Sequence, residues 1–228
     1  MFFLPFTFIA INSHAQSIRG IAVLVKGGYI FAPEAGKTLD QIPPATTKTF
    51  SNLFYCGGVE YYLRLNKFIV GMEGMIAQQS QALINDQFYV PRITYGHLKI
   101  GYLIRDSKNF MFYPSISSGL SRMALIRNYK LNNENTFRLM TPSFDIGINA
   151  DYVFSQRQDA NKKFSGVMMA FKAGYRFSPG SKSWRDNKNI LDGLPTFVNQ
   201  GFYITIGVGF GYFVQKVKHI KYQKKFFD

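Results

Sequence analysis

Apolar and polar residues alternate along most of this chain after residue 15, and turn-forming residues separate the alternating stretches. A period of two places every second side chain on the same face of an extended strand, so this pattern predicts β-structure. Eight strands are predicted, over 18–31, 52–65, 68–77, 94–104, 110–125, 138–154, 164–177 and 200–214. No run of about 18 apolar residues occurs, which excludes a transmembrane helix.

The links between the predicted strands alternate strictly in length. Short links cover 66–67, 106–108 and 156–163, and longer ones cover 33–50, 78–93, 128–137 and 178–199. Bacterial outer-membrane barrels show this asymmetry, with short periplasmic turns and longer outer loops. We therefore predict an all-β fold, an eight-stranded antiparallel up-and-down transmembrane β-barrel, with both termini on the periplasmic side.

The predicted strand at 138–154 indicates which way the two faces of the sheet point. One face carries Phe144, Ile146 and Ile148, and the other carries Asp145 and Asp151. The apolar faces are broad and aromatic, as in the interfacial girdles of a membrane barrel. The polar faces combine charges with glycines, which suits the narrow inside of a small barrel. The pattern favours an apolar outside; a soluble lipocalin-like lipid-binding barrel is the main alternative.

The composition agrees with a sheet and with a membrane barrel. Aromatic residues make up 17% of the 228 residues, with 23 Phe and 14 Tyr, and aromatic residues favour strands. The mean hydropathy is −0.07, and a membrane barrel reaches such values because lipid-facing and inward residues average out. The single cysteine, Cys56, cannot form an internal disulfide.

The predicted turn at Asn66-Lys67 fixes the register of two strands. A two-residue hairpin pairs Leu65 with Phe68 and places Glu60 opposite Glu73. Facing carboxylates inside a barrel need cations, so we predict a paired charge network and a plugged polar lumen. The predicted members are Lys26, Glu60, Arg64, Glu73, His97, Lys99, Asp145, Asn149, Asp151, Lys172 and Arg176. Asp145 and Asp151 are expected to neighbour Lys172 and Arg176.

Candidate chemistry is sparse, and we expect no catalysis. A three-residue turn at 106–108 would place His97 opposite Ser117, and a Ser–His pair beside a carboxylate resembles the parts of a hydrolase. A lipid A-modifying outer-membrane enzyme is therefore one alternative function, and a narrow pore is another. The glycines at 207, 209 and 211 share one strand face and do not form a nucleotide loop. No cofactor and no metal are expected, since no paired Cys or His spacing occurs.

The charge of the chain points to anionic lipid. Lys and Arg number 27 against 13 Asp and Glu, a net charge of +14. These cations are spread over turns, loops and the C-terminal end, without a Lys/Arg-rich helix, so we expect no nucleic-acid partner. In the link at 178–199, contact with lipopolysaccharide phosphates or with an unknown protein partner is predicted for Trp184, Lys182, Arg185 and Lys188. A solvated loop with an interfacial tryptophan is the alternative.

The two ends of the chain predict its export and its domain limits. Residues 1–15 are apolar, uncharged and end in Ser-His-Ala, which is typical of a secretory signal peptide. The barrel is expected over 16–215. A basic tail follows at 216–228, where it either contacts anionic lipid or peptidoglycan or is a disordered end. The predicted location is the outer membrane of a Gram-negative bacterium.

Three stretches resemble strands of a known family. They are Lys26-Gly27-Gly28-Tyr29, Gly174-Tyr175-Arg176-Phe177 and the segment from Gly207 to Phe213. They look like strands of the small outer-membrane β-barrel proteins of Bacteroidetes, within the broader OmpA/OmpX-type barrels. The resemblance implies eight strands, insertion by the outer-membrane assembly machinery and often no known activity. It also implies an assembly signal in a final strand that ends in an aromatic residue, which Phe213 would supply.

Overall fold

The computed structural model of the chain describes residues 17–42, 50–84, 87–107, 109–128, 134–154, 163–186, 189–191 and 193–216. The predicted signal peptide, Lys188 and the predicted tail beyond residue 216 lie outside the described residues. Within the described ranges, no helix has the length and apolar character needed to cross a membrane.

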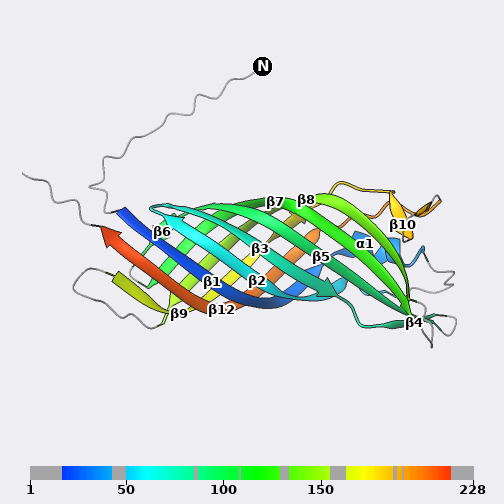
Figure 1. The fold of residues 1–228 in the computed structure, drawn as a ribbon, viewed down its shortest axis with the longest axis horizontal. Coiled ribbons are helices and arrows are strands. Elements are labelled where there is room, and N and C mark those ends of the chain that lie inside the picture. Colours follow the sequence, from blue (N-terminus) through cyan, green and yellow to red (C-terminus); the bar gives the residue numbers. More distant parts are fainter. Residues whose placement is uncertain are drawn as a thin grey trace, which may run out of the picture.

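Eight long strands in the described chain form a closed antiparallel barrel (Figure 1). They are β1 (Ser17–Phe31), β2 (Leu53–Leu65), β3 (Phe68–Gln78), β5 (Gln87–Tyr102), β7 (Phe110–Asn128), β8 (Glu134–Val153), β9 (Lys163–Phe177) and β12 (Gly201–Lys216). Each long strand pairs with the next one along the chain, and β12 returns to pair with the whole of β1. The predicted fold class is confirmed.

The turn between β2 and β3 shows how local sequence sets the register. Asn66 has a φ of 60°, a left-handed conformation that asparagine tolerates and that two-residue hairpins require. Leu65 consequently pairs with Phe68, and Glu60 pairs with Glu73. This register was predicted from the hairpin alone and is confirmed.

The connections differ in part from the prediction. β7 and β8 stay paired up to Asn128 and Glu134, so their connection covers only 129–133, whereas the connection 154–162 at the opposite end is longer. The predicted strict alternation of long and short links is wrong at this point. The extended pairing satisfies backbone groups that a longer loop would have left to water.

The longer connections contain secondary structure at one end of the barrel, which we call the loop end. There Figure 1 shows α1 (Pro33–Leu39), β4 (Ala82–Ile84) and β10 (Trp184–Asp186), and β10 pairs with β11 (Asn189–Leu191). The opposite end, which we call the turn end, carries β6 (Arg105–Asp106). Ser17 and Lys216 pair with each other at the turn end, so the described chain begins and finishes on that side.

Buried apolar side chains form two separate layers inside the barrel. The loop-end core includes Leu39 from α1, Phe54 from β2 and Trp184 from β10. The turn-end core includes Leu24, Tyr62, Ile69, Met168 and Phe213. Phe213 therefore points inward, and Tyr212 is an outward aromatic beside it on β12. The implied role of Phe213 in assembly stays a prediction.

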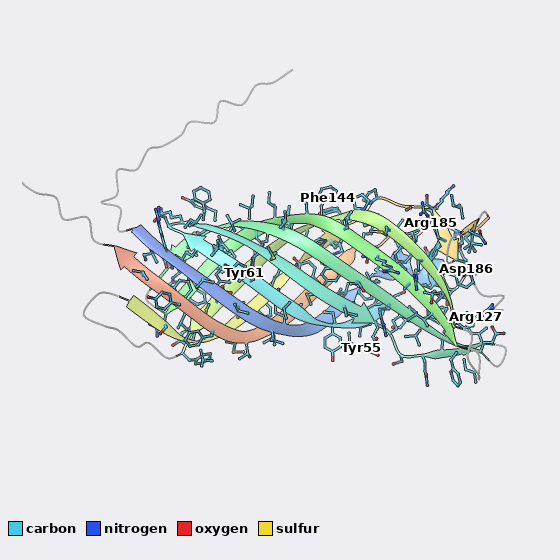
Figure 2. The ribbon with its side chains drawn as sticks, in the orientation of Figure 1. Tyr55, Tyr61, Arg127, Phe144, Arg185 and Asp186 are labelled. Carbon is cyan, nitrogen blue, oxygen red and sulfur yellow. The ribbon has the colours of Figure 1, made fainter. Side chains whose placement is uncertain are left out.

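The outer surface of the barrel is apolar. Ile146 is 55% exposed and Leu98 is 67% exposed, and outward positions of every long strand carry such side chains. In Figure 2, Tyr55 and Phe144 lie at the outer edge of the barrel wall. The orientation of the two strand faces is therefore the one that the alternation pattern favoured.

Candidate functional site

Ten of the predicted network residues lie together at mid-height inside the barrel, between the two apolar cores. We call them the charged belt: Lys26, Glu60, Glu73, His97, Lys99, Asp145, Asn149, Asp151, Lys172 and Arg176. None is more than 4% exposed. They come from inward positions of six strands, β1, β2, β3, β5, β8 and β9. Where one strand supplies two or three of them, they are an even number of residues apart, because side chains two residues apart share a face.

Two glutamates form the centre of the belt. Glu60 on β2 and Glu73 on β3 are direct cross-strand partners. Lys26 bridges them, with its Nζ 2.5 Å from Glu60 Oε2 and 3.0 Å from Glu73 Oε2. Lys172 donates to Glu73 at 2.9 Å, and Lys99 donates to Glu60. Three lysines from β1, β5 and β9 thus relieve the repulsion between the two carboxylates.

A second group is built on β8 and β9. Asp145 and Arg176 are cross-strand partners, and the guanidinium donates to both carboxylate oxygens at 2.9 and 3.0 Å. The same guanidinium lies 3.7 Å from the centre of the Tyr95 ring. The Nδ1 atom of His97 is 3.2 Å from Asp145 Oδ2, and its Nε2 is 2.6 Å from Ser143 Oγ. A bidentate pair of this kind has a fixed geometry, so it holds the Asp145 carboxylate in place beside the imidazole.

Asp151 has two tyrosine hydroxyl partners. Tyr62 donates to its carboxylate at 2.6 Å, and Tyr113 donates at 3.1 Å. Lys99 Nζ lies 5.2 Å from the centre of the Tyr62 ring and 5.3 Å from that of the Tyr113 ring. The two rings therefore connect a buried carboxylate with a buried ammonium group.

One predicted neighbour relationship is wrong. Asp151 lies opposite Ala170, and Lys172 lies opposite Asn149. Lys172 instead crosses the inside of the barrel to reach Glu73 on β3. Strand pairing alone could not give this contact, because long side chains in a narrow barrel span to the opposite wall.

Arg64 is separate from the charged belt. Its side chain is buried at the turn end, where it pairs with Asp106 and donates from Nε to the backbone oxygen of Asn66 at 3.1 Å. These contacts link the turn between β2 and β3 with β6.

The ionic groups of the belt balance. Four carboxylates, at positions 60, 73, 145 and 151, face four cations, at positions 26, 99, 172 and 176. Buried charges persist only when they are paired and hydrogen-bonded, and removing one partner leaves an uncompensated charge. Some of these ion pairs connect strands that are not neighbours in the wall, as Lys172 on β9 and Glu73 on β3 do.

The predicted contact between His97 and Ser117 is absent. His97 lies opposite Gly119, and Ser117 lies opposite Lys99. The turn after Asp106 is wider than predicted, since Asp106 pairs with Met111, and the register of β7 shifts accordingly. Ser117 Oγ has no hydrogen-bond partner among the described residues.

Ser143, His97 and Asp145 instead lie in the residue order of a catalytic triad: Ser143 and His97 share a hydrogen bond, and His97 Nδ1 lies 3.2 Å from Asp145 Oδ2 without a hydrogen-bond partner in the described part of the chain. Ser121 donates to Ser143 at 2.7 Å. All of these side chains are buried, and apolar cores lie on both sides of them. Sequence reasoning missed Ser143 and Tyr113, although both share the inward parity of Asp145 and Asp151.

The ligand atoms of Glu73, His97 and Asp145 lie within 4.8 Å of one another. Lys26, Lys172 and Arg176 already contact these carboxylates. A divalent cation would meet three positive charges there, so the donor set does not suit a metal. The predicted absence of a metal stays a prediction.

A row of small residues crosses the wall at inward positions of four strands. Gly101, Ser115, Gly147 and Gly174 are successive cross-strand partners on β5, β7, β8 and β9. A Cβ at Gly174 would lie 2.5 Å from the Tyr203 hydroxyl oxygen, so the row leaves room for inward tyrosine rings.

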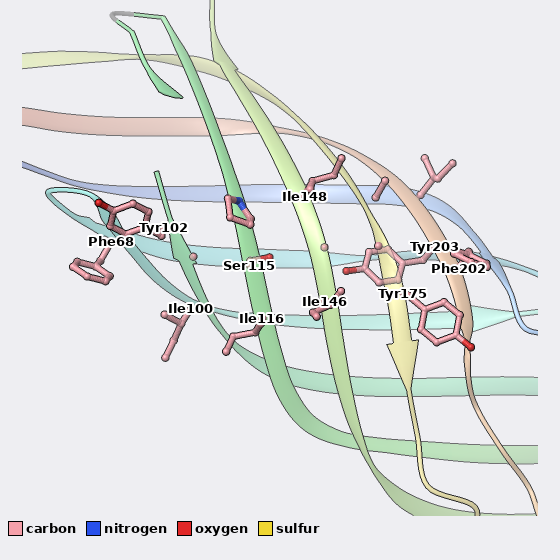
Figure 3. Close-up of a pocket in the computed structure, with 16 residues that line it drawn as sticks. Phe68, Ile100, Tyr102, Ser115, Ile116, Ile146, Ile148, Tyr175, Phe202 and Tyr203 are labelled. Carbon is pink, nitrogen blue, oxygen red and sulfur yellow. The ribbon is translucent and has the colours of Figure 1, made fainter. Parts of the chain in front are cut away.

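On the outer side of this row the wall is hollowed. The hollow has a volume of about 970 Å³, and outward apolar side chains line it (Figure 3). Its lining includes Ile100, Ile116, Ile146, Tyr175 and Phe202.

The residues of the link 178–199 that were predicted to contact lipid or a partner differ in exposure. Trp184 is 0% exposed, its Nε1 donates to the Pro195 oxygen at 2.8 Å, and its ring packs edge-on against Phe197. The prediction that Trp184 contacts lipid or a partner is therefore wrong, because the connection folds into a core of its own. Lys182 and Arg185 are exposed.

No protein-family model matches the chain, and no curated protein matches it in sequence. Among solved structures, the chain is similar to Neisserial surface protein A, with 10% identity over 87% of this chain and 97% of that chain, and a TM-score of 0.40. It is similar to the N-terminal β-barrel domain of Pseudomonas aeruginosa OprF, with 12% identity over 87% and 99% of the chains and a TM-score of 0.39. The outer-membrane protease OmpT from Escherichia coli gives 10% identity over 89% and 97%, with a TM-score of 0.31.

Proposed function

We propose that this protein is an integral outer-membrane β-barrel of a Gram-negative bacterium, with an occluded inside and a structural or interaction role through its loop end. The observation that carries the proposal is the opposite chemistry of the two strand faces. Large apolar side chains point outward from all eight long strands, for example Val25, Val59, Met72, Leu98, Ile116, Ile146, Phe171 and Ile206. The ionisable side chains of the belt point inward.

A water-soluble barrel would not tolerate this arrangement. Monomeric soluble proteins rarely expose contiguous apolar patches above about 300–600 Å². Here the apolar outer surface extends around the barrel, because each long strand contributes to it. In hydrocarbon the same surface has no cost, and the closed barrel leaves no unpaired strand edge between its long strands. A lipocalin-like soluble barrel is therefore not favoured.

The direction of insertion follows from the two ends. Longer connections gather at the loop end and the described chain ends lie at the turn end, as in barrels whose loops face outward and whose turns face the periplasm. The predicted signal peptide and insertion by the outer-membrane assembly machinery agree with this direction. The resemblance to barrels of Bacteroidetes is part of the same proposal.

The occluded inside rests on three layers of side chains. The charged belt fills the middle, and the loop-end and turn-end cores lie on either side of it. The proposal therefore assigns the barrel neither conductance nor catalysis, and leaves the loop end as the surface for an unknown protein partner.

Cell fractionation combined with heat-dependent gel mobility tests the proposed location. We expect the protein in the outer-membrane fraction, with a mobility that changes when the unboiled sample is heated, because a folded barrel resists detergent. Recovery in the soluble periplasmic fraction would overturn the proposal.

Occlusion and the absence of catalysis have separate tests. In planar bilayers we expect no steady single-channel current, and a sustained open current would refute the occluded inside. Replacing Ser143 or His97 with alanine should leave the cellular lipid A profile unchanged by mass spectrometry. A lost lipid A modification in either variant would favour the enzymatic alternative.

A further inference from the structure

Four exposed arginines lie side by side on the outer wall near the loop end. Arg92 on β5 and Arg138 on β8 both pair with Ala124 of β7, one from each side. Arg122 is two residues from Ala124 on β7 and so points the same way, and Arg185 of β10 pairs with Arg138. We call these four residues the arginine cluster; Figure 2 shows Arg185 at the loop end.

The arginine cluster is compact. Neighbouring strands are about 4.8 Å apart and residues two apart on a strand are about 6.6 Å apart. The Cα atoms of Arg92, Arg122 and Arg138 therefore lie within about 10 Å of one another. Side chains as long as arginine can converge on one or two anionic groups from such positions.

Among the side chains that the structure describes, no acidic one forms an ion pair with the arginine cluster, whereas Arg64 and Arg176 each pair with an aspartate. Like charges directly opposite each other, as at Arg138 and Arg185, destabilise a sheet. An external anion would relieve this repulsion.

The arginine cluster also lies at the edge of the apolar surface. Outward positions of β7 run from Phe112 through Ile116 and Leu120 to Arg122. Ten residues of strand cover about 33 Å, which a tilt of about 45° reduces to about 23 Å, close to the apolar band of about 25 Å in outer-membrane barrels. In the proposed orientation the arginines thus reach the headgroup level on the loop side.

We propose that the arginine cluster binds the phosphate groups of lipid A in the outer leaflet, a site that rests on the proposed outer-membrane location. Planar guanidinium groups bind phosphate oxygens in pairs, so several of them fit a phosphorylated sugar headgroup. Arg92, Arg122 and Arg138 lie on β5, β7 and β8. The lining of the apolar hollow includes Ile100, Ile116 and Ile146 of the same three strands, farther from the loop end. It provides a surface for the acyl chains of the same lipid.

The test uses the full chain refolded in detergent micelles that contain hexa-acylated bisphosphoryl lipid A, with retained lipid counted by native mass spectrometry. The variant R92Q/R122Q/R138Q should lose lipid A binding at least tenfold. The control R19Q/K67Q/R105Q removes the same charge from exposed turn-end positions and should bind as the unmodified chain does. An R92K/R122K/R138K variant keeps the charge and should fall between them.

The specificity arm replaces lipid A with its phosphate-free form or with phosphatidylglycerol, and both should be retained at least tenfold less well. Equal retention of either lipid, or unchanged binding by the glutamine variant, would overturn the inference. Heat-dependent mobility is measured on every sample. If the chain inserts and shows the mobility shift, but its lipid A binding does not depend on the arginines, only this site is refuted. If the chain never inserts, the proposed function is refuted and the site with it.

Discussion

The two faces of β8 have opposite chemistry on one backbone. Phe144 and Ile146 point outward and are exposed, while Asp145 between them is buried in a bidentate pair with Arg176. In a soluble barrel the exposed face would be the polar one. In the proposed membrane location this difference places the outer surface in hydrocarbon, while the inside relies on ion pairing. A slip of one residue in register would exchange the two faces, so the register is strongly specified.

The inside differs from a uniform polar lumen. The charged belt is bounded by apolar cores, so its ion pairs are shielded from water along the barrel axis as well as by the wall. Charges in such surroundings interact more strongly and tolerate the loss of a partner less well.

The largest loss of stability is expected when one charged side chain of the charged belt is removed. Glu73→Ala removes the carboxylate that holds Lys26 and Lys172, and should lower the free energy of unfolding by about 3–5 kcal/mol, since it leaves buried cations unpaired. Urea unfolding of the refolded chain, followed by gel mobility, measures the change. The control is Glu34→Ala, which breaks the exposed pair with Lys37 and should cost at most about 1 kcal/mol. Equal losses in both variants would refute a shielded belt.

The next effect concerns the outer face. Ile146→Arg, near the middle of the apolar band, should destabilise the barrel in a lipid bilayer by about 2–4 kcal/mol, whereas Phe154→Arg, beyond the turn end of β8, should cost about 0–1 kcal/mol. Both side chains are exposed. If the outer face were in water, the two substitutions would be equally harmless in the same unfolding measurement.

The smallest effect concerns the glycine row. Gly174→Ala should destabilise by about 1–3 kcal/mol, because the added methyl group meets the backbone oxygen of Ile146 and the Tyr203 hydroxyl. Gly74→Ala meets nothing within 4 Å and should be neutral or stabilising. Thermal gel-shift midpoints rank the two variants, and a tolerated Gly174→Ala would show that the wall is less tightly packed than described.

The sequence predicted the strand set, the facing of the strands and the Glu60–Glu73 pair because alternation and one hairpin turn determine them locally. It did not predict that Lys172 reaches Glu73 or that His97 contacts Ser143. Those contacts depend on the width of the turn after Asp106 and on the curvature of the closed barrel, which no local pattern encodes. The burial of Trp184 was missed for a similar reason, since the connections of the loop end pack on one another.

The most direct test of the central claim is tryptophan quenching in bilayers whose acyl chains carry bromine. Trp184 is the only tryptophan and is buried at the loop end, so the unmodified chain provides an unquenched reference. In a Trp184→Phe background, Ile146→Trp should be strongly quenched by the brominated chains and unaffected by aqueous acrylamide. Quenching by acrylamide without quenching by bromine would place this face in water and contradict the account.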